Sequence, residues 1–149
     1  MRHVICFGNP LHGDDGFGSA VYSRLSETAG LPADVKIFDA GTCGLNALSL
    51  FEDCQEAILI DALEPNGQPG HVSQPDAQSL LGESSLPLHA VDVGYLLKAL
   101  SALDVPMPRV VVAEACSIQP FHPFLSVPMK RAVAETCRLV YQILGIAHG

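Results

Sequence analysis

Short apolar runs recur along the chain, and each of them predicts a buried β-strand. These runs occupy residues 4–7, 35–39, 57–61 and 109–113. The run at 57–61 is the clearest, because it stays apolar until its last residue, Asp61. A further strand, at the edge of the sheet, is predicted at residues 70–73, after a turn-rich loop.

Helical periodicity fills the segments between these runs. Apolar side chains recur at helical spacing in residues 17–29, 45–51, 91–103 and 127–144. Residues 116–125 show no such period and predict irregular structure. The alternation of strands and helices predicts an α/β layer fold with a mainly parallel sheet.

Composition narrows the classes of function. The chain has 149 residues, 48% hydrophobic and 16% charged, and we expect a single domain over residues 1–149. The net charge of −8 argues against a nucleic-acid surface or an anionic membrane surface, and it favours a metal ion or a cationic peptide as partner. No apolar run approaches the roughly 20 residues of a membrane span, and residues 4–7 are too short for a secretory signal, so we expect a cytoplasmic protein.

The cysteines do not form a recognisable framework. They are Cys6, Cys43, Cys54, Cys116 and Cys137. Their odd number and the lack of C-x-x-C spacing argue against both a disulfide scaffold and a closed zinc site. We expect mostly buried, reduced thiols.

Candidate chemistry is expected where strands end, because sites in parallel sheets gather at the carboxyl ends of the strands. That position selects residues 8–18, residues 39–44 and Asp61. Asp14 and Asp15 open the first helix, where carboxylates ordinarily cap the helix, and Asp61 ordinarily caps the turn after its strand. If the first and third strand runs are neighbours, Asp15 and Asp61 approach each other. Two adjacent carboxylates repel, so a cation or a shared proton is then expected between them.

His89 lies at the boundary before the helix predicted at 91–103. An isolated histidine is ordinarily a surface residue or a satisfied polar group. Together with Asp15 and Asp61, however, it makes an open three-ligand set that suits a borderline divalent ion. We expect these three side chains to meet at one rim of the sheet and to face solvent.

Several familiar chemistries lack their motifs. The chain has no H-E-x-x-H helix and no G-x-S-x-G elbow, and the glycine-rich segment 8–18 has no Walker lysine. A small-molecule enzyme that holds phosphate on this segment is therefore disfavoured, whereas a cysteine nucleophile is not excluded.

Segment 8–18, GNPLHGDDGFG, resembles the opening motif of the nickel-iron hydrogenase maturation endopeptidases. Further blocks agree in order with that family: residues 39–42, 44–45 and 60–62, His89 before a leucine-rich helix, and residues 118–120. The resemblance spans nearly the whole chain. Cys6 and Ala40 depart from it, since the family often has glycine at both positions.

The resemblance implies both a fold and an activity. The fold is a three-layer sandwich of the phosphorylase/hydrolase-like type, with a twisted, mostly parallel sheet of about five strands between helices. The activity is that of an endopeptidase that removes a C-terminal extension from the nickel-loaded precursor of the hydrogenase large subunit. The family's metal-contacting positions carry over to Asp15, Asp61 and His89, and the two aspartates are the candidate catalytic residues.

The candidate substrate-binding residues are Gly41, Thr42 and Asn9. Gly41 and Thr42 are expected to form part of the floor of a cleft, where small residues admit a peptide. A tight turn also requires glycine at such a position, and both explanations hold together.

We hypothesise that Asp15, Asp61 and His89 contact nickel presented by the precursor, so that coordination tests whether nickel has been inserted. Water is activated in one of two ways. Either the metal polarises the scissile carbonyl or lowers the pKa of water, or Asp15 or Asp61 acts as general base. The alternative class is a non-catalytic module that docks the nickel-loaded partner without cutting it. We expect a monomer.

Overall fold

A computed structural model of the chain describes residues 1–81 and 91–146. Within these ranges the strands are β1 (Arg2–Phe7), β2 (Val35–Gly41), β3 (Glu56–Leu63), β4 (Val72–Ser73) and β5 (Arg109–Glu114). They form one sheet in the order β2-β1-β3-β5-β4. β1 runs parallel to β2 and to β3, β5 runs parallel to β3, and the short β4 is antiparallel at the edge. The predicted five-stranded, mostly parallel sheet is confirmed.

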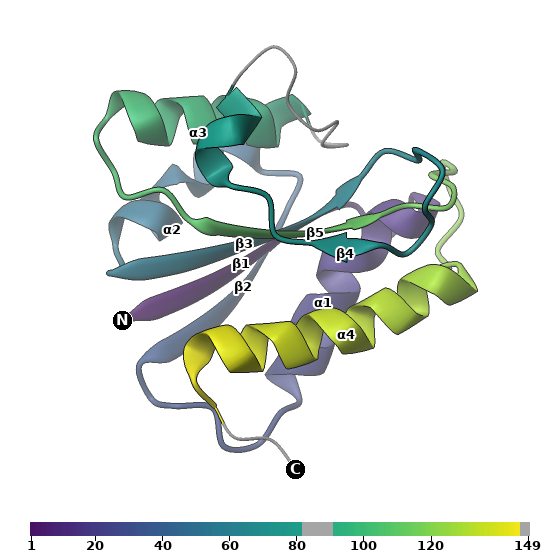
Figure 1. Cartoon of the computed structure of the whole chain (residues 1–149), viewed down its shortest axis with the longest axis horizontal. Coiled ribbons are helices and arrows are strands. Elements are labelled where there is room, and N and C mark those ends of the chain that lie inside the picture. The colour runs from purple at the N-terminus through teal and green to yellow at the C-terminus, as the bar shows by residue number, and fades with distance from the viewer. Residues whose placement is uncertain (82–90, 147–149) are drawn as a thin grey trace.

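Helices cover both faces of this sheet (Figure 1). α1 (Phe17–Ser26) and α4 (Val127–Leu144) pack on one face. α2 (Leu48–Glu52) and α3 (Val91–Ala102) pack on the other face. Short 3-10 turns complete the elements: η1 (Gly13–Gly16), η2 (Gly44–Ala47) and η3 (Ala77–Leu81). The three-layer α/β sandwich is thus confirmed, and the helix predicted at 127–144 has the predicted limits.

Successive residues of the central strands belong to two separate hydrophobic cores, one on each face, because side chains alternate across a sheet. In β1, Val4 packs with α1 and α4, whereas Ile5 packs with α2 and α3. In β3, Leu59 and Leu63 belong to the core under α2 and α3. The same alternation assigns Asp61, between these two leucines, to the face of the sheet that α2 and α3 cover.

β3 extends beyond its predicted end. It continues through Ala62 and Leu63, which pair with Ala113 and Glu114 of β5. Asp61 therefore lies inside a strand and does not terminate one, so the predicted strand end is wrong, and the turn cap, which was one of two explanations for Asp61, does not apply. The charge of Asp61 suggested an end to the strand, but the neighbouring β5 supplies a ladder that carries the backbone past it.

Two predicted helices are shorter than expected. The helix predicted at 17–29 ends at Ser26, and the segment predicted as a helix at 45–51 is divided between η2 and the five-residue α2.

No helix in the described ranges is long and apolar enough to cross a membrane.

The expectation of mostly buried thiols is wrong. All five cysteines are free, but only Cys6 and Cys137 are buried. Cys43 and Cys116 are exposed, because they lie in the connections that follow β2 and β5 and not within a strand or helix.

Candidate active site

The two candidate carboxylates follow neighbouring strands. β1 and β3 pair directly, with Cys6 opposite Ile60. Asp61 is the residue after Ile60, and the chain leaving β1 reaches η1, which carries Asp15, after the five-residue connection 8–12. The structure therefore brings Asp15 and Asp61 together at the carboxyl ends of β1 and β3, as expected if these strands are neighbours, and their charges interact.

Asp61 is a fully buried carboxylate with one oxygen held locally. Its exposed fraction is 0%, and its Oδ1 accepts a hydrogen bond from the backbone N–H of Ala62 at 2.8 Å. No group in the described part of the chain donates a hydrogen bond to its Oδ2. Burial raises the pKa of Asp61 well above its ordinary value, the Ala62 N–H opposes that shift, and the negative charge of Asp15 adds to it. A buried oxygen in this state favours a proton or a cation next to it.

Asp15 is held on the turn that leaves β1. Its exposed fraction is 4%, and its Oδ2 accepts a hydrogen bond from the backbone N–H of Asn9 at 3.0 Å. The turn is tight because residue 8 is glycine. Gly8 has φ +141, and a Cβ there would lie 2.1 Å from the carbonyl oxygen of Asp15. Glycine therefore allows η1 to pack directly against the end of β1, which fixes where the Asp15 carboxylate stands.

The expectation that both carboxylates face solvent is wrong, since their exposed fractions are 4% and 0%. The reason lies in the backbone. Asp61 sits within the sheet under the α2 and α3 layer, and Asp15 sits on a turn packed against the end of β1.

The sequence suggested that Asp14 caps a helix, but the structure gives this residue a different role. No side-chain cap hydrogen bond is found at the start of η1 or of α1. Instead the buried Asp14 carboxylate accepts hydrogen bonds from the backbone N–H groups of Cys116, Ser117 and Ser126 and from the Ser126 hydroxyl, at 2.7 to 3.1 Å. Asp14 thus joins the site turn to the connection between β5 and α4. Only a weak signal in the sequence pointed to this role of Asp14. Ser126 lies at the N-cap position of α4, but its side chain makes no capping hydrogen bond to that helix.

Gly41, Thr42 and Asn9 lie at the ends of β2 and β1. Gly41 has φ +54, which confirms the predicted tight turn requiring glycine. Its carbonyl accepts the Gly8 N–H at 2.9 Å, so the end of β2 is fixed beside the residue that precedes Asn9. Gly41 and Asn9 are half-buried and Thr42 is exposed. Their contact with a substrate stays a prediction.

His89 lies outside the described residues. Among the residues that the structure does describe, no group of three or more His, Cys, Asp or Glu side chains is placed to hold a metal ion. The described part of the candidate centre is therefore the carboxylate pair of Asp15 and Asp61.

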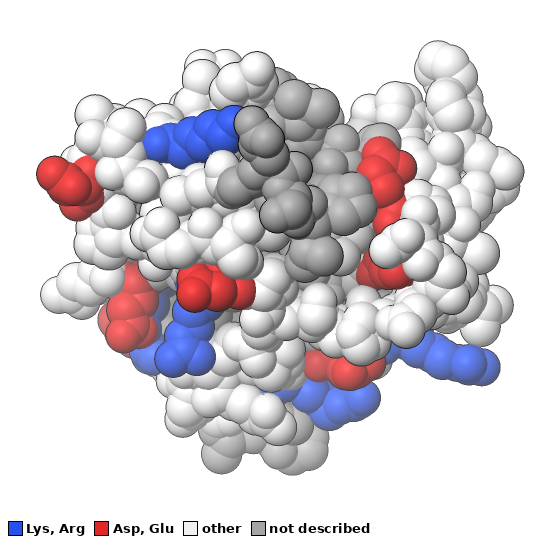
Figure 2. Space-filling view, turned by 45° about the horizontal axis from the view of Figure 1, so that its top comes forward, with Lys and Arg blue, Asp and Glu red and all other residues white. Residues whose placement is uncertain are grey.

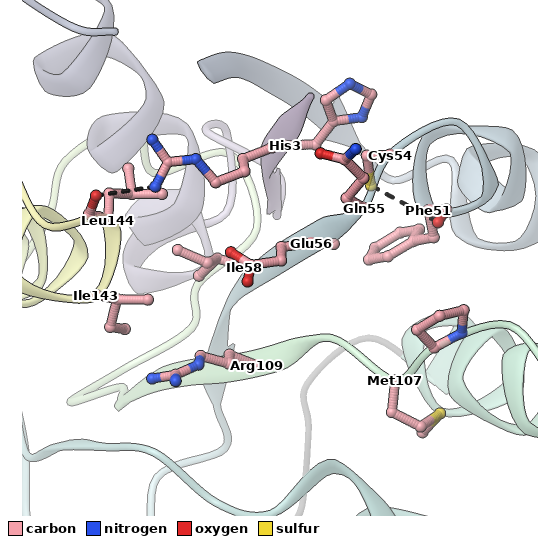
Figure 3. A pocket seen from close by; sticks show the side chains of 13 residues that line it. His3, Phe51, Cys54, Gln55, Glu56, Ile58, Met107, Arg109, Ile143 and Leu144 are labelled. Atoms are coloured by element: carbon pink, nitrogen blue, oxygen red, sulfur yellow. Dashed lines mark hydrogen bonds between the residues drawn. The ribbon is translucent and has the colours of Figure 1, made fainter. Parts of the chain in front are cut away.

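A pocket of about 220 Å³ lies elsewhere, at the amino ends of β1, β3 and β5 (Figure 3). Several of its polar groups are engaged within the protein. Arg2 binds Asp34 and the carbonyl of Leu144, and His3 Nδ1 lies 2.8 Å from the carbonyl of Leu50. This pocket lies at the amino ends of the strands, whereas Asp15 and Asp61 lie towards their carboxyl ends, so it does not contribute to the candidate site.

Surface charge does not single out one partner. On the face shown in Figure 2, acidic and basic side chains are interspersed, and broad areas between them carry no charge.

Comparison with known proteins agrees with the fold and shows the family. The family model for hydrogenase maturation proteases of the HycI type matches residues 19–144. The chain is 31% identical over 146 residues to a putative hydrogenase maturation protease of Methanocaldococcus jannaschii, a match that covers 92% of each chain. It is 35% identical over 89 residues to the hydrogenase expression/formation protein HupD of Rhodobacter capsulatus, a match that covers 58% of this chain but only 42% of HupD.

A solved structure of a hydrogenase maturation peptidase has the same fold. The chain superimposes with a TM-score of 0.73 on the hydrogenase 2 maturation peptidase of a Thaumarchaeota archaeon, at 30% identity. That superposition covers 98% of this chain and 99% of the archaeal one.

Proposed function

The chain belongs to the hydrogenase maturation protease family, and we propose that its substrate is the nickel-loaded precursor of a nickel-iron hydrogenase large subunit. As an endopeptidase it hydrolyses one peptide bond and releases the C-terminal extension of that precursor. Nickel arrives with the precursor, as part of the substrate.

One observation carries the proposal of a nickel contact. Asp61 is fully buried beside Asp15, and its Oδ2 accepts no hydrogen bond from any described group. A carboxylate oxygen in that state fits a cation, because a cation supplies the charge and the contact that the protein withholds. We infer that Asp15 and Asp61, together with His89, contact the nickel of the precursor. Two carboxylates and one imidazole leave further coordination positions for the ligands that the precursor itself provides.

Such a contact discriminates between loaded and empty precursors. A nickel-free precursor lacks one anchoring interaction, and a contact of about 4 kcal/mol corresponds to a discrimination of roughly a thousandfold. Cleavage would then follow metal insertion and not precede it.

The same carboxylates serve the hydrolysis. A water molecule attacks the scissile carbonyl, the carbon–nitrogen bond breaks, and the leaving nitrogen takes a proton. Asp15 or Asp61 acts as general base for the water, or nickel polarises the carbonyl while the two carboxylates hold the metal. In both arrangements Asp15 and Asp61 are the catalytic residues of the proposal. Gly41, Thr42 and Asn9 contact the substrate backbone at the ends of β1 and β2.

We also propose that the protein is a cytoplasmic monomer. Its five free cysteines suit a reducing compartment. Light scattering coupled to size-exclusion chromatography checks the monomer at working concentration.

Intact-mass spectrometry tests the proposed function. The purified protein is mixed with the nickel-loaded precursor and, separately, with the same precursor prepared without nickel. The proposal predicts loss of the C-terminal extension only from the loaded form. Binding of the loaded precursor without any loss of mass indicates the non-catalytic module, and equal cleavage of both forms contradicts nickel-dependent recognition.

A further inference from the structure

The connection between β5 and α4 presents large aromatic side chains to solvent. Residues 121–124, here called the aromatic segment, include Phe121 with an exposed fraction of 86% and Phe124 with 67%. Leu11, on the turn after β1, is 55% exposed. Single exposed apolar residues are common, but two aromatic residues exposed to this degree in one short segment are typical of a surface that binds another molecule.

The backbone of Phe121 adopts a strained conformation. Phe121 has φ +60, a left-handed conformation that side chains other than glycine seldom adopt. Two hydrogen bonds fix the next residue: the His122 N–H donates to the Leu11 carbonyl at 2.8 Å, and the Gly13 N–H donates to the His122 carbonyl at 2.6 Å. Backbone strain of this kind persists only where surrounding contacts hold the residue in place, and strained residues are often found at functional sites.

A continuous series of contacts joins the aromatic segment to the candidate active site. The rings of Phe121 and His12 lie edge to face with centroids 6.1 Å apart. His12 Nδ1 lies 3.5 Å from Asn9 Nδ2, and the Asn9 backbone N–H donates to Asp15 Oδ2 at 3.0 Å. The Asp14 carboxylate fastens the two ends of the connection that contains the segment. In Figure 1 this connection, green at the right, lies beside the turn that precedes α1.

A hollow of about 190 Å³ adjoins the aromatic segment. Its walls include the apolar Pro10, Pro123 and Leu125, and the remaining lining residues are small: Gly13, Gly16, Ser19, Ala20 and Ser23. A hollow of this size admits one apolar side chain of a partner, next to the exposed rings.

We propose that the aromatic segment and this hollow form the docking surface for an apolar stretch of the precursor protein. This inference rests on the proposed function, since a protease with a protein substrate must seat that substrate at a fixed distance from its carboxylates. The contacts from Phe121 to Asp15 provide such a fixed distance. Aromatic side chains are typical anchors of protein interfaces. The segment itself carries no Lys, Arg, Asp or Glu, so the partner stretch is apolar and not charged.

The experiment compares variants that change only exposed residues. Phe121→Ser with Phe124→Ser removes the aromatic rings, and Leu103→Ser is the control, since Leu103 is 58% exposed and follows α3 on the other face of the sheet. For each protein, KM and kcat are measured with the nickel-loaded precursor, and the Kd of the precursor complex is measured separately. We expect the double variant to raise KM and Kd by tenfold or more, with kcat changed by less than about twofold, and Leu103→Ser to match the wild type.

The outcomes separate the two proposals. If the wild type cleaves the precursor and the double variant has an unchanged KM and Kd, the docking surface is refuted while the proposed function stands. If the wild type does not cleave the precursor, the proposed function fails, and the Kd values alone decide the docking surface. A wild type that dimerises, and a double variant that does not, would assign the surface to a second copy of this chain and overturn the inference.

Discussion

The carboxylate of Asp14 accepts hydrogen bonds from both the backbone N–H and the hydroxyl of Ser126, at 2.7 and 2.8 Å, although 112 positions separate the two residues. Asp14 lies next to Asp15, and Ser126 directly precedes α4. One buried side chain thereby ties the turn of the candidate site to the segment that opens the C-terminal helix.

Replacing Asp14 with alanine is expected to lower the free energy of unfolding by about 3 kcal/mol, because it leaves several buried N–H groups without an acceptor. Asp53→Ala is the control, since Asp53 is an exposed carboxylate on the connection before β3, and a change of less than about 0.5 kcal/mol is expected there. Denaturant unfolding measures both values. Equal stability of the two variants would refute the role of Asp14 as a structural tie.

Replacing Asp61 with asparagine is expected to stabilise the metal-free protein by about 2 kcal/mol at neutral pH, because it removes an ionisable group whose burial is unfavourable and keeps the shape. The raised pKa of Asp61 gives the pH dependence. The wild type loses stability as the pH rises through the folded-state pKa, whereas the asparagine variant does not. The difference should therefore shrink as the pH falls towards the ordinary value of 3.8.

Thermal unfolding of both proteins, in a chelator and across that pH range, measures this difference. A variant less stable than the wild type at neutral pH, or a gap that widens on acidification, would show that Asp61 is held as a well-compensated carboxylate.

Four of the five cysteines should react in two groups. Cys43 and Cys116 are exposed and should be alkylated first. Burial raises the pKa of the Cys137 thiol to about 11 and raises that of Cys6 further, so both thiols should resist alkylation in the folded protein. Iodoacetamide labelling followed by peptide mapping checks the order. Early labelling of Cys6 would mean that the core under α1 opens readily.

Glycine at position 18 is expected to be indispensable. A Cβ at Gly18 would lie 2.0 Å from the carbonyl oxygen of Phe7, where α1 crosses the end of β1, so Gly18→Ala should cost more than about 3 kcal/mol. Gly94→Ala, in α3, is the matched control. A Cβ there meets no atom of the residues that the structure describes within 4 Å, and we expect a gain of about 0.5 to 1 kcal/mol from helix propensity. Melting temperatures that change equally for both variants would contradict the close packing of α1 on β1.

The sheet was predictable from the sequence because its central strands are buried on both faces. A run such as 57–61 then has no polar face and stands out as a continuous apolar segment, and the alternation of strands and helices indicated a mainly parallel sheet. The adjacency of β1 and β3 was a condition of the prediction and did not follow from that alternation. The position of Asp61 within β3 was not predictable in this way. Whether a strand continues past a charged residue depends on the neighbouring strand, and here β5 continues the ladder as far as Glu114.

Burial and long-range contacts limited the prediction of the site. Asp15 and Asp61 were selected correctly as neighbours, but their low exposure depends on the packing around them, which the sequence does not display. The partners of Asp14 lie more than 100 positions away, beyond the reach of local capping rules. The exposure of Phe121 and Phe124 was equally hidden, since aromatic residues are ordinarily expected in a core.

Asp15 and Asp61 are proposed to contact the nickel of the precursor and to carry out the cleavage. The most direct test measures single-turnover cleavage of the nickel-loaded precursor by Asp15→Asn, Asp61→Asn and Asp53→Asn, each first shown to be folded. We expect Asp15→Asn and Asp61→Asn to lose more than about a hundredfold in rate, with Asp53→Asn within about twofold of the wild type. Cleavage at the wild-type rate by a folded Asp15→Asn or Asp61→Asn protein would contradict the claim.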